Sequence, residues 1–166
     1  GIPHGSARHF YPALEALLRG LLAELGARHD AWLARPLPAR ATGSWRLLVE
    51  CLIDRSARYQ RRNPVLAKLT IGGYTPPELK RLDRDADFDR ARFLIRRLDE
   101  WFVLPRHRDN LRVAYYSIEA VDTAFMLSMR EFGRLTPWWV RQAKRTANAV
   151  LAAHFGQQLL PRRRGG

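Results

Sequence analysis

The fold is decided by residues 109–132, which read DNLRVAYYSIEAVDTAFMLSMREF. At about 100° per residue in an α-helix, one face of this segment collects Leu111, Tyr115, Ile118, Asp122, Phe125, Met126 and Met129. The opposite face collects Tyr116, Ala120, Thr123, Ala124 and Leu127. A helix that is apolar all round is buried on both sides. We therefore expect one side to pack on its own domain and the other, with its small residues, to contact a second subunit.

The other segments are also predicted to be amphipathic helices, because their apolar residues recur at i, i+3, i+4 and i+7. The predicted ranges are 12–32, 44–62, 64–70, 88–102 and 136–155, with a further helix beginning at Pro76. The charged stretch 80–89 is either a solvated helix or a break. No segment shows sustained strand alternation, so the sequence predicts one all-α domain.

The net charge of the 166-residue chain is +13, which invites a nucleic-acid interpretation. Its distribution argues against a simple version of that interpretation. Residues 1–34 have a net charge of 0, residues 35–112 of +8 and residues 113–166 of +5. Most of the surplus is therefore predicted to form a solvated, arginine-rich surface.

Several function classes lack their sequence signals. Cys51 is the only cysteine, so no intrachain disulfide or cysteine zinc cluster can form, and a reducing compartment is expected. No uncharged run reaches the ~20 apolar residues of a membrane span, and we expect a cytoplasmic protein. Catalytic, phosphate-binding and metal-binding motifs are absent, so we predict no enzyme, no cofactor and no metal site. His29 and His154 lie on apolar stripes and are predicted to be hydrogen-bonded core or interface histidines.

The first eighteen residues, GIPHGSARHFYPALEALL, resemble the end of a TetR-family DNA-binding domain. That family typically reads Gly-Val-Ser, a variable residue, Gly-Ser/Thr-Leu-Tyr, an aromatic pair and Pro, and then Ser/Asn-Lys-Glu-Ala-Leu-Leu. Gly1 matches the turn glycine, residues 3–10 match the recognition helix, and Tyr11-Pro12 matches the Phe-Pro turn. The chain departs from the pattern at Ala7-Arg8, where the family has Leu-Tyr, and at Leu14, where it has a phosphate-binding lysine.

The resemblance implies a division of the chain into three parts. Residues 1–11 are a remnant of a helix-turn-helix domain whose first two helices are absent, so we expect the chain to be incomplete at its N-terminus. Residues 12–160 are a ligand-binding and dimerisation domain, an orthogonal helical bundle whose last two helices pair across a two-fold axis. Residues 161–166 are expected to be a disordered tail.

The resemblance also implies the function. We expect a ligand-responsive transcriptional regulator, a repressor that binds double-stranded operator DNA as a homodimer and is released by an apolar or amphipathic small molecule. The candidate DNA-binding residues are His4, Ser6, Arg8 and His9. The candidate ligand-binding residues are Trp45, Tyr59, Phe93, Tyr115, Ile118, Asp122, Phe125 and Met126. The candidate dimer-interface residues are Tyr116, Ala120, Thr123, Leu127, Val140, Ala143, Ala147 and Val150.

Alternatives remain open at two levels. Asp122 lies on an apolar face, where an unpaired carboxylate is costly. It is either a counter-charge for a cationic ligand or, as we favour, the partner of water or of an arginine such as Arg58, Arg92 or Arg96. For the function of the whole chain, an alternative hypothesis is a basic all-α domain that binds nucleic acid or an acidic partner through its arginines. A helical enzyme or carrier with an internal cavity is a third possibility.

Overall fold

A computed structural model describes the backbone of residues 4–71 and 80–162, and the side chains of residues 16–71 and 85–162. Within these ranges the regular secondary structure is entirely helical, which confirms the all-α prediction. The elements are α1 (His4–Ala34), η1 (Ala39–Thr42), α2 (Trp45–Arg62), α3 (Pro64–Thr70), α4 (Lys80–Asp99), α5 (Asn110–Phe132) and α6 (Pro137–Phe155). Among the described residues, no helix is long and apolar enough to cross a membrane.

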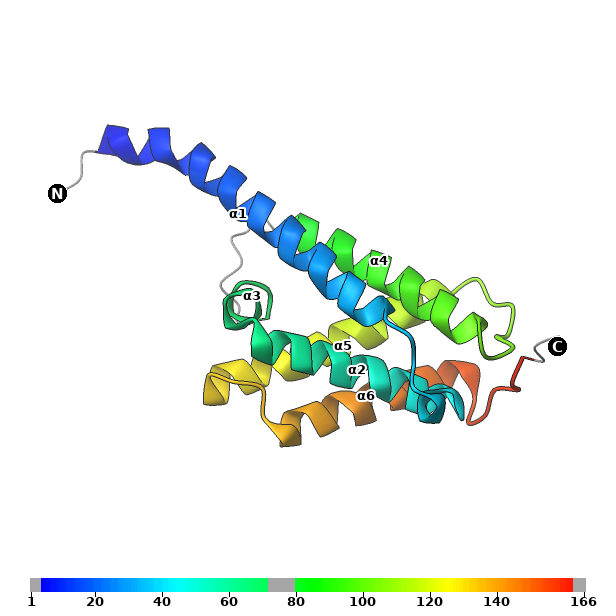
Figure 1. The fold of residues 1–166 in the computed structure, drawn as a ribbon. Coiled ribbons are helices and arrows are strands. Elements are labelled where there is room, and N and C mark those ends of the chain that lie inside the picture. Colours follow the sequence, from blue (N-terminus) through cyan, green and yellow to red (C-terminus); the bar gives the residue numbers. More distant parts are fainter. Residues whose placement is uncertain (1–3, 72–79, 163–166) are drawn as a thin grey trace.

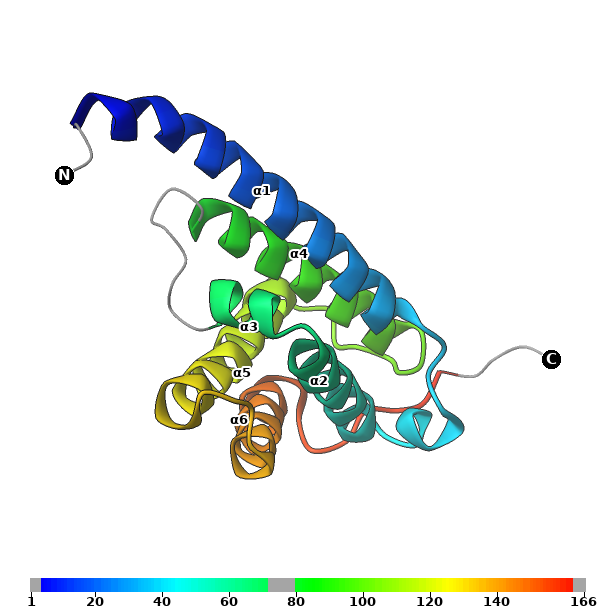
Figure 2. The same ribbon diagram turned by 60° about the vertical axis from the view of Figure 1, so that its left-hand side comes forward.

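α5 lies at the centre of the bundle, with α4 packed on one side and α6 on another (Figure 1). α2 packs against α6 and also contacts α1, α3 and α4. α1 runs diagonally over the molecule, and in both views its N-terminal half extends beyond the other helices (Figures 1 and 2). Its C-terminal half lies along α4 and next to α2. This arrangement leaves space between α1, α2, α4 and α5 to be filled by side chains.

Large apolar side chains from four helices form the core. Trp45 and Leu48 of α2, Leu98 of α4, Phe125 of α5 and Leu151 of α6 are each at most 1% exposed. Small residues on the facing helices, such as Ala114 and Ala143 at 0% exposure, allow these helices to approach closely. The apolar stripes in the sequence therefore meet in one core, as helix periodicity predicts.

Short polar side chains fix the ends of the helices where the sequence predicted them. Ser44 Oγ accepts a hydrogen bond from the backbone N–H of Leu47 at the start of α2, at 3.2 Å. Thr136 caps α6 in the same way, and Gly133 ends α5 with a left-handed φ of 64°. Ser128 Oγ joins the two helices, since it donates to the carbonyl of Arg134 and accepts from the N–H of Thr136. The antiparallel α5–α6 pair is thus fixed at its connecting turn.

α1 differs from the prediction, because it is one continuous helix where a turn was expected at Tyr11-Pro12. The boundary predicted between residues 11 and 12 is therefore not a break in the backbone. The φ of proline is compatible with a helix, although a proline inside a helix removes one backbone hydrogen bond and crowds the carbonyl four residues earlier. Among the described elements, no other helix lies beside this part of α1 (Figure 2).

Two further boundaries are corrected by backbone hydrogen bonds. The charged stretch 80–89 is helical, and α4 ends at Asp99 rather than at residue 102. The tail predicted to be disordered is held at its first two residues. Pro161 forms an isolated bridge with Phe102, and the N–H of Arg162 donates to the carbonyl of Trp101 at 2.8 Å. Residues 163–166 of that tail lie outside the described residues.

Gly133 offers a test of this fold by stability. Gly133→Ala places a Cβ in a left-handed conformation, and we expect a loss of about 1 kcal/mol in the free energy of unfolding. Gly20→Ala is the matched control, because Gly20 lies within α1 with no neighbouring atom within 4 Å of an added Cβ. There the same substitution should stabilise the protein by about 0.5–1 kcal/mol. Urea unfolding measures both values, and equal effects at the two positions would contradict the assigned end of α5.

Candidate functional site

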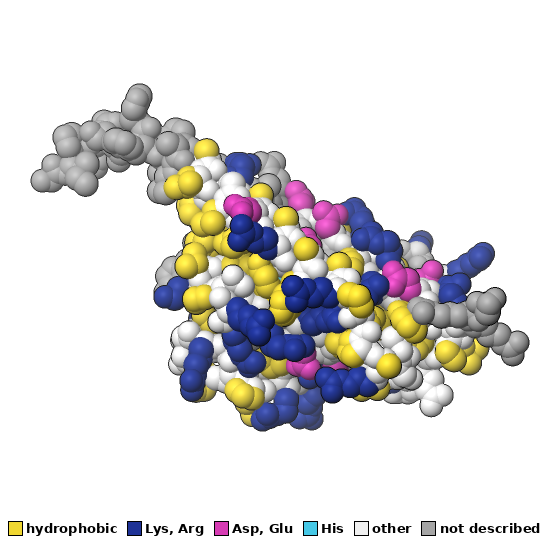
Figure 3. Space-filling view, in the orientation of Figure 1, with side chains coloured by type: hydrophobic (Ala, Val, Ile, Leu, Met, Phe, Trp, Pro, Cys, Tyr) yellow, Lys and Arg dark blue, Asp and Glu magenta, His cyan; other side chains and the backbone are white. Residues whose placement is uncertain are grey.

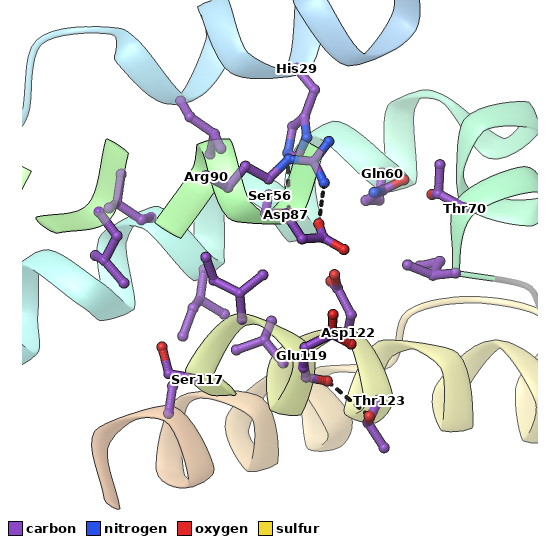
Figure 4. Close-up of a pocket in the computed structure, with 18 of the residues that line it drawn as sticks. His29, Ser56, Gln60, Thr70, Asp87, Arg90, Ser117, Glu119, Asp122 and Thr123 are labelled. Atoms are coloured by element: carbon purple, nitrogen blue, oxygen red, sulfur yellow. Dashed lines mark hydrogen bonds and ion pairs between the residues drawn. The ribbon is translucent and has the colours of Figure 1, made fainter. Parts of the chain in front are cut away.

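A cavity of about 270 Å³ lies among α1, α2, α3, α4 and α5 (Figure 4). This volume is close to the lower end of the ~300–1,000 Å³ typical of small-molecule sites. Its apolar wall includes Leu33 of α1, Leu52 and Ile53 of α2, Phe93 of α4 and Met126 of α5. Polar side chains enter from α1, α2, α4 and α5. The cavity therefore has the composition of a ligand site, with an apolar wall and a few polar groups.

Arg90 of α4 carries the positive charge among the described residues of the cavity wall. Its Nη1 donates to Asp87 Oδ1 at 2.6 Å, and its Nε donates to Asp30 Oδ1 of α1 at 3.4 Å. Burial lowers the pKa of Arg90, but the carboxylates of Asp87, Asp122 and Asp30 together raise it above its usual value. The guanidinium thus stays charged and ties α1, α4 and α5 together at the cavity.

His29 of α1 closes the cavity from above in the close-up view (Figure 4). It is 4% exposed, its Nε2 lies 3.2 Å from Ser56 Oγ, and its ring stacks on Tyr59 at a centroid distance of 4.9 Å. Burial and, to a smaller extent, the positive charge of Arg90 lower the pKa of His29 to about 3. The imidazole is therefore neutral at physiological pH and can make hydrogen bonds but no ion pair.

Four of the eight predicted ligand-binding residues line this cavity, namely Phe93, Ile118, Asp122 and Met126. The other four lie elsewhere. Trp45 and Phe125 are 1% and 0% exposed and belong to the core. Tyr59 donates its hydroxyl to the carbonyl of Leu25 at 3.3 Å, and Tyr115 stacks on Phe88 at 4.2 Å. These four side chains do not line the cavity, so the cavity does not support a role for them in ligand binding. Large aromatic side chains at helical spacing also serve to fill a core.

The structure also answers part of the question about Asp122. It lines the cavity, and its charge acts on Arg90. Arg90 was not among the three arginines considered from the sequence. Arg92, one of those three, instead pairs with Asp89 at 2.6 Å. Asp122 therefore both faces the cavity and interacts with an arginine, which the sequence had presented as alternatives.

Sequence reasoning missed the polar residues His29, Gln60, Asp87 and Arg90, all of which line the cavity. For Gln60 a signal existed, since it continues the buried face of α2 one turn after Ser56. For Asp87 and Arg90 the i, i+3 spacing of opposite charges was visible at the end of a charged stretch interpreted as either solvated or a break. Only the packing of α1 and α5 against α4 turns that stretch into a cavity wall.

The predicted dimer interface is partly corrected. Tyr116 is 64% and Leu127 38% exposed, and Ala120 and Thr123 lie between them on the outer stripe of α5, where Thr123 is exposed and also lines the cavity. On α6, by contrast, Val140, Ala143 and Ala147 are 6%, 0% and 1% exposed, so their side chains face the chain's own core. Val150 is half-buried. A helix with one apolar stripe uses it for its own core first, and this stripe is therefore not available to a partner.

Two other predictions concern DNA and metals. The side chains of His4, Ser6, Arg8 and His9 lie outside the described residues, although the backbone of α1 includes these positions. Among the side chains that are described, no group of His, Cys, Asp and Glu has the arrangement of a metal site. The Nε2–H of His154 donates a hydrogen bond to Asn110 Oδ1 at 2.8 Å.

Comparison of the chain with protein-family models, with curated proteins and with solved structures found no match in any of the three. The site is therefore interpreted from its own geometry.

The buried, neutral His29 makes stability depend on pH. Its pKa is about 3 in the folded chain and about 6.5 when unfolded, so between these values the unfolded state binds more protons. The neutral His29 makes its full contribution to the free energy of unfolding above pH 6.5, and this contribution is lost as the pH falls. Between pH 7 and pH 5 the free energy of unfolding should fall by about 2 kcal/mol. His29→Gln should remove this loss. Urea unfolding at both pH values measures it.

The exposed His107 provides the control for that experiment. His107→Gln should keep the wild-type pH dependence. An equal pH dependence in His29→Gln and the wild type would show that His29 is not the group responsible.

Proposed function

We propose that this chain is the ligand-binding and dimerisation part of a TetR-like transcriptional regulator, a repressor that an apolar or amphipathic small molecule releases from its operator. The observation that carries the proposal is the cavity, because one of its walls belongs to α1. The N-terminal end of the same helix carries the segment that resembles a recognition helix. A ligand that fits between α1, α4 and α5 can therefore act on both regions through one rigid element.

The geometry of α1 supports such a coupling. His29 and Leu33 of α1 line the cavity, while His4 begins the helix 25 residues earlier. At 1.5 Å per residue this separation is about 38 Å. A small rotation of the helix at the cavity becomes a larger displacement at its far end. A ligand shifts the position of α1 only by its differential affinity for the two arrangements of the helices.

Polar contacts as well as ring stacking hold α1 at the cavity. Arg90 reaches Asp30, Ser56 faces His29, and the indole N–H of Trp32 donates to the carbonyl of Arg55 at 3.2 Å. A hydrogen bond or ion pair can exchange one partner for another, whereas close-packed apolar side chains deform little. We infer that a ligand beside Arg90 and His29 biases the position of α1 through these contacts.

Dimerisation belongs to the same proposal and uses the outer stripe of α5. Tyr116, Ala120, Thr123 and Leu127 form a continuous, largely apolar stripe with small residues at its centre. Two copies of this stripe can approach closely about a two-fold axis. Recognition of successive major grooves requires two N-terminal segments, one from each copy.

One observation favours a second candidate function, binding of a nucleic acid through the basic surface. Lys and Arg side chains are spread over the face that α2 and α6 present in Figure 3. The exposed arginines on these helices and on the turn before α6 are Arg58, Arg61, Arg62, Arg134, Arg141 and Arg145. Within the described residues no carboxylate forms an ion pair with any of the six, unlike Arg90, Arg92 and Arg97. Duplex binding by this chain that falls steeply with salt would favour this candidate.

Filling the cavity tests the ligand-binding part of the proposal. Met126→Trp puts a larger side chain into the cavity, whereas Arg130→Trp adds the same side chain one turn later at an exposed position. Fluorobenzene, a neutral apolar probe, should broaden its ¹⁹F NMR line with the wild type and with Arg130→Trp. Its affinity should fall at least about tenfold in Met126→Trp, because the apolar space is occupied. Equal binding to the two variants would contradict a ligand site in this cavity.

Light scattering tests the dimer. At tens of micromolar we expect a mass of about twice the 19.2 kDa of the chain. Tyr116→Arg should raise the dissociation constant at least about tenfold, because it places a charge in an apolar interface. Val103→Arg changes another exposed apolar residue outside the stripe and should leave the mass unchanged. A monomeric wild type would contradict this part of the proposal.

A further inference from the structure

The amide of Gln60 is the unusual polar group of the cavity. Gln60 lines the cavity and is 6% exposed, and its Oε1 is buried without a hydrogen-bond partner. Among the described residues, three other buried side-chain atoms have no hydrogen-bond partner, namely Trp45 Nε1, Arg97 Nε and Asn148 Oδ1. None of these three residues lines the cavity. A buried acceptor without a donor destabilises a folded protein by about 1–3 kcal/mol. Its position in a cavity wall suggests that a bound molecule supplies the donor.

The helix that carries Gln60 does not require a polar residue there. Residues 49, 52 and 53 of α2 line the same cavity with Val, Leu and Ile, and Ser56 and Gln60 follow on that face. The hydroxyl of Ser56 forms a hydrogen bond with His29 Nε2 at 3.2 Å. An apolar side chain at position 60 would fill the same space without leaving an acceptor unpaired. Gln60 thus carries a cost in stability that recognition of a ligand would offset.

Several hydrogen-bond donors of the protein around the cavity are engaged by the protein itself. Arg90 donates to Asp87 and to Asp30. The hydroxyl of Thr70 donates to the carbonyl of Leu66 at 3.0 Å, and the hydroxyl of Ser117 donates to that of Ala114 at 2.7 Å. The hydroxyls of Thr70 and Ser117 are therefore not available to a ligand that accepts hydrogen bonds. A ligand that donates one meets Gln60 Oε1.

The charges of the cavity wall favour a positive ligand. Among the described lining residues, three are carboxylates, Asp87, Glu119 and Asp122, and one is a guanidinium, Arg90. Figure 4 shows Asp87 and Asp122 pointing towards one another from α4 and α5. Asp30 outside the cavity also shares Arg90. The local charge balance is therefore opposite to the +13 of the whole chain.

We propose that the ligand of this cavity is a small amphipathic amine whose N–H group donates to Gln60 Oε1. Its apolar body lies against the Leu, Ile and Phe side chains of the wall, and the carboxylates of α4 and α5 stabilise its positive charge. This inference rests on the proposed function of the cavity as a ligand site and adds the chemical class of the ligand. The observation specific to it is the acceptor of Gln60.

Matched probes separate the hydrogen bond from the charge and from the apolar contact. 2-Phenylethylamine is protonated at pH 7 and donates N–H groups, its trimethylammonium analogue keeps the charge without a donor, and propylbenzene has neither. A cavity of about 150 Å³ holds benzene, so a phenyl ring with a short chain suits one of about 270 Å³. Isothermal titration calorimetry at pH 7 measures the three affinities. We expect the amine to bind at least about tenfold more tightly than either analogue.

Two variants of Gln60 test the acceptor itself. Gln60→Met keeps the length of the side chain without the oxygen, and it should lower the affinity for the amine about tenfold while leaving propylbenzene unchanged. Gln60→Glu keeps an acceptor and adds a negative charge. It should retain or raise the affinity for the amine and weaken that for propylbenzene. Circular dichroism confirms that each variant is folded, and Gln60→Glu alone tests the proposal if Gln60→Met is not.

The outcomes distinguish this inference from the proposed function. Equal affinities for the amine and its trimethylammonium analogue, or an unchanged amine affinity in Gln60→Met, would overturn the role of Gln60. Loss of binding in Met126→Trp with no preference among the probes would keep the ligand site and reject the amine. Failure of the wild type to bind any probe, including fluorobenzene, would overturn both proposals.

Discussion

The burial of α5 between α4 and α6 is the constraint on which the rest of the structure depends. Ala114, Val121, Ala124 and Phe125 are each at most 8% exposed, so α5 cannot move without opening the core on two sides. Its buried serines are compatible with this position because their hydroxyls donate to backbone carbonyls. α2 and α6 then pack against each other, and α1 and α4 cover the remaining side. The cavity lies where this covering is incomplete.

Electrostatics gives the cavity a character that differs from the surface of the protein. Arg90 holds three carboxylates from α1, α4 and α5 close to one another, and His29 beside it remains neutral. The exposed arginines of α2 and α6 face solvent on another part of the molecule (Figure 3). The net charge of the chain is thus a poor guide to the charge of the cavity, because charges at the surface are screened whereas those in a cavity act at short range.

Much of the fold was predictable from helix periodicity and end signals. The bounds of α2, α3, α5 and α6 agree closely with the predicted ranges, because Ser44, Gly133 and Thr136 mark their ends by local chemistry. Of the site, the sequence predicted Phe93, Ile118, Asp122 and Met126 at the cavity, but it missed Gln60 and Arg90. It also assigned the inner stripe of α6 to a partner. Periodicity identifies a buried face and does not say what buries it.

The sequence by itself determined the helical class, most helix ends and the apolar faces, since these depend on residues within one turn of each other. Only the tertiary structure decided that α1 continues through Pro12, that residues 161 and 162 return to the end of α4, and that Val140 and Ala143 face inwards. It alone brought His29, Gln60 and Arg90 to one cavity, from helices that are far apart in the chain. Such contacts depend on which helices pack together, and the residue pattern of one helix does not identify the helices that pack against it.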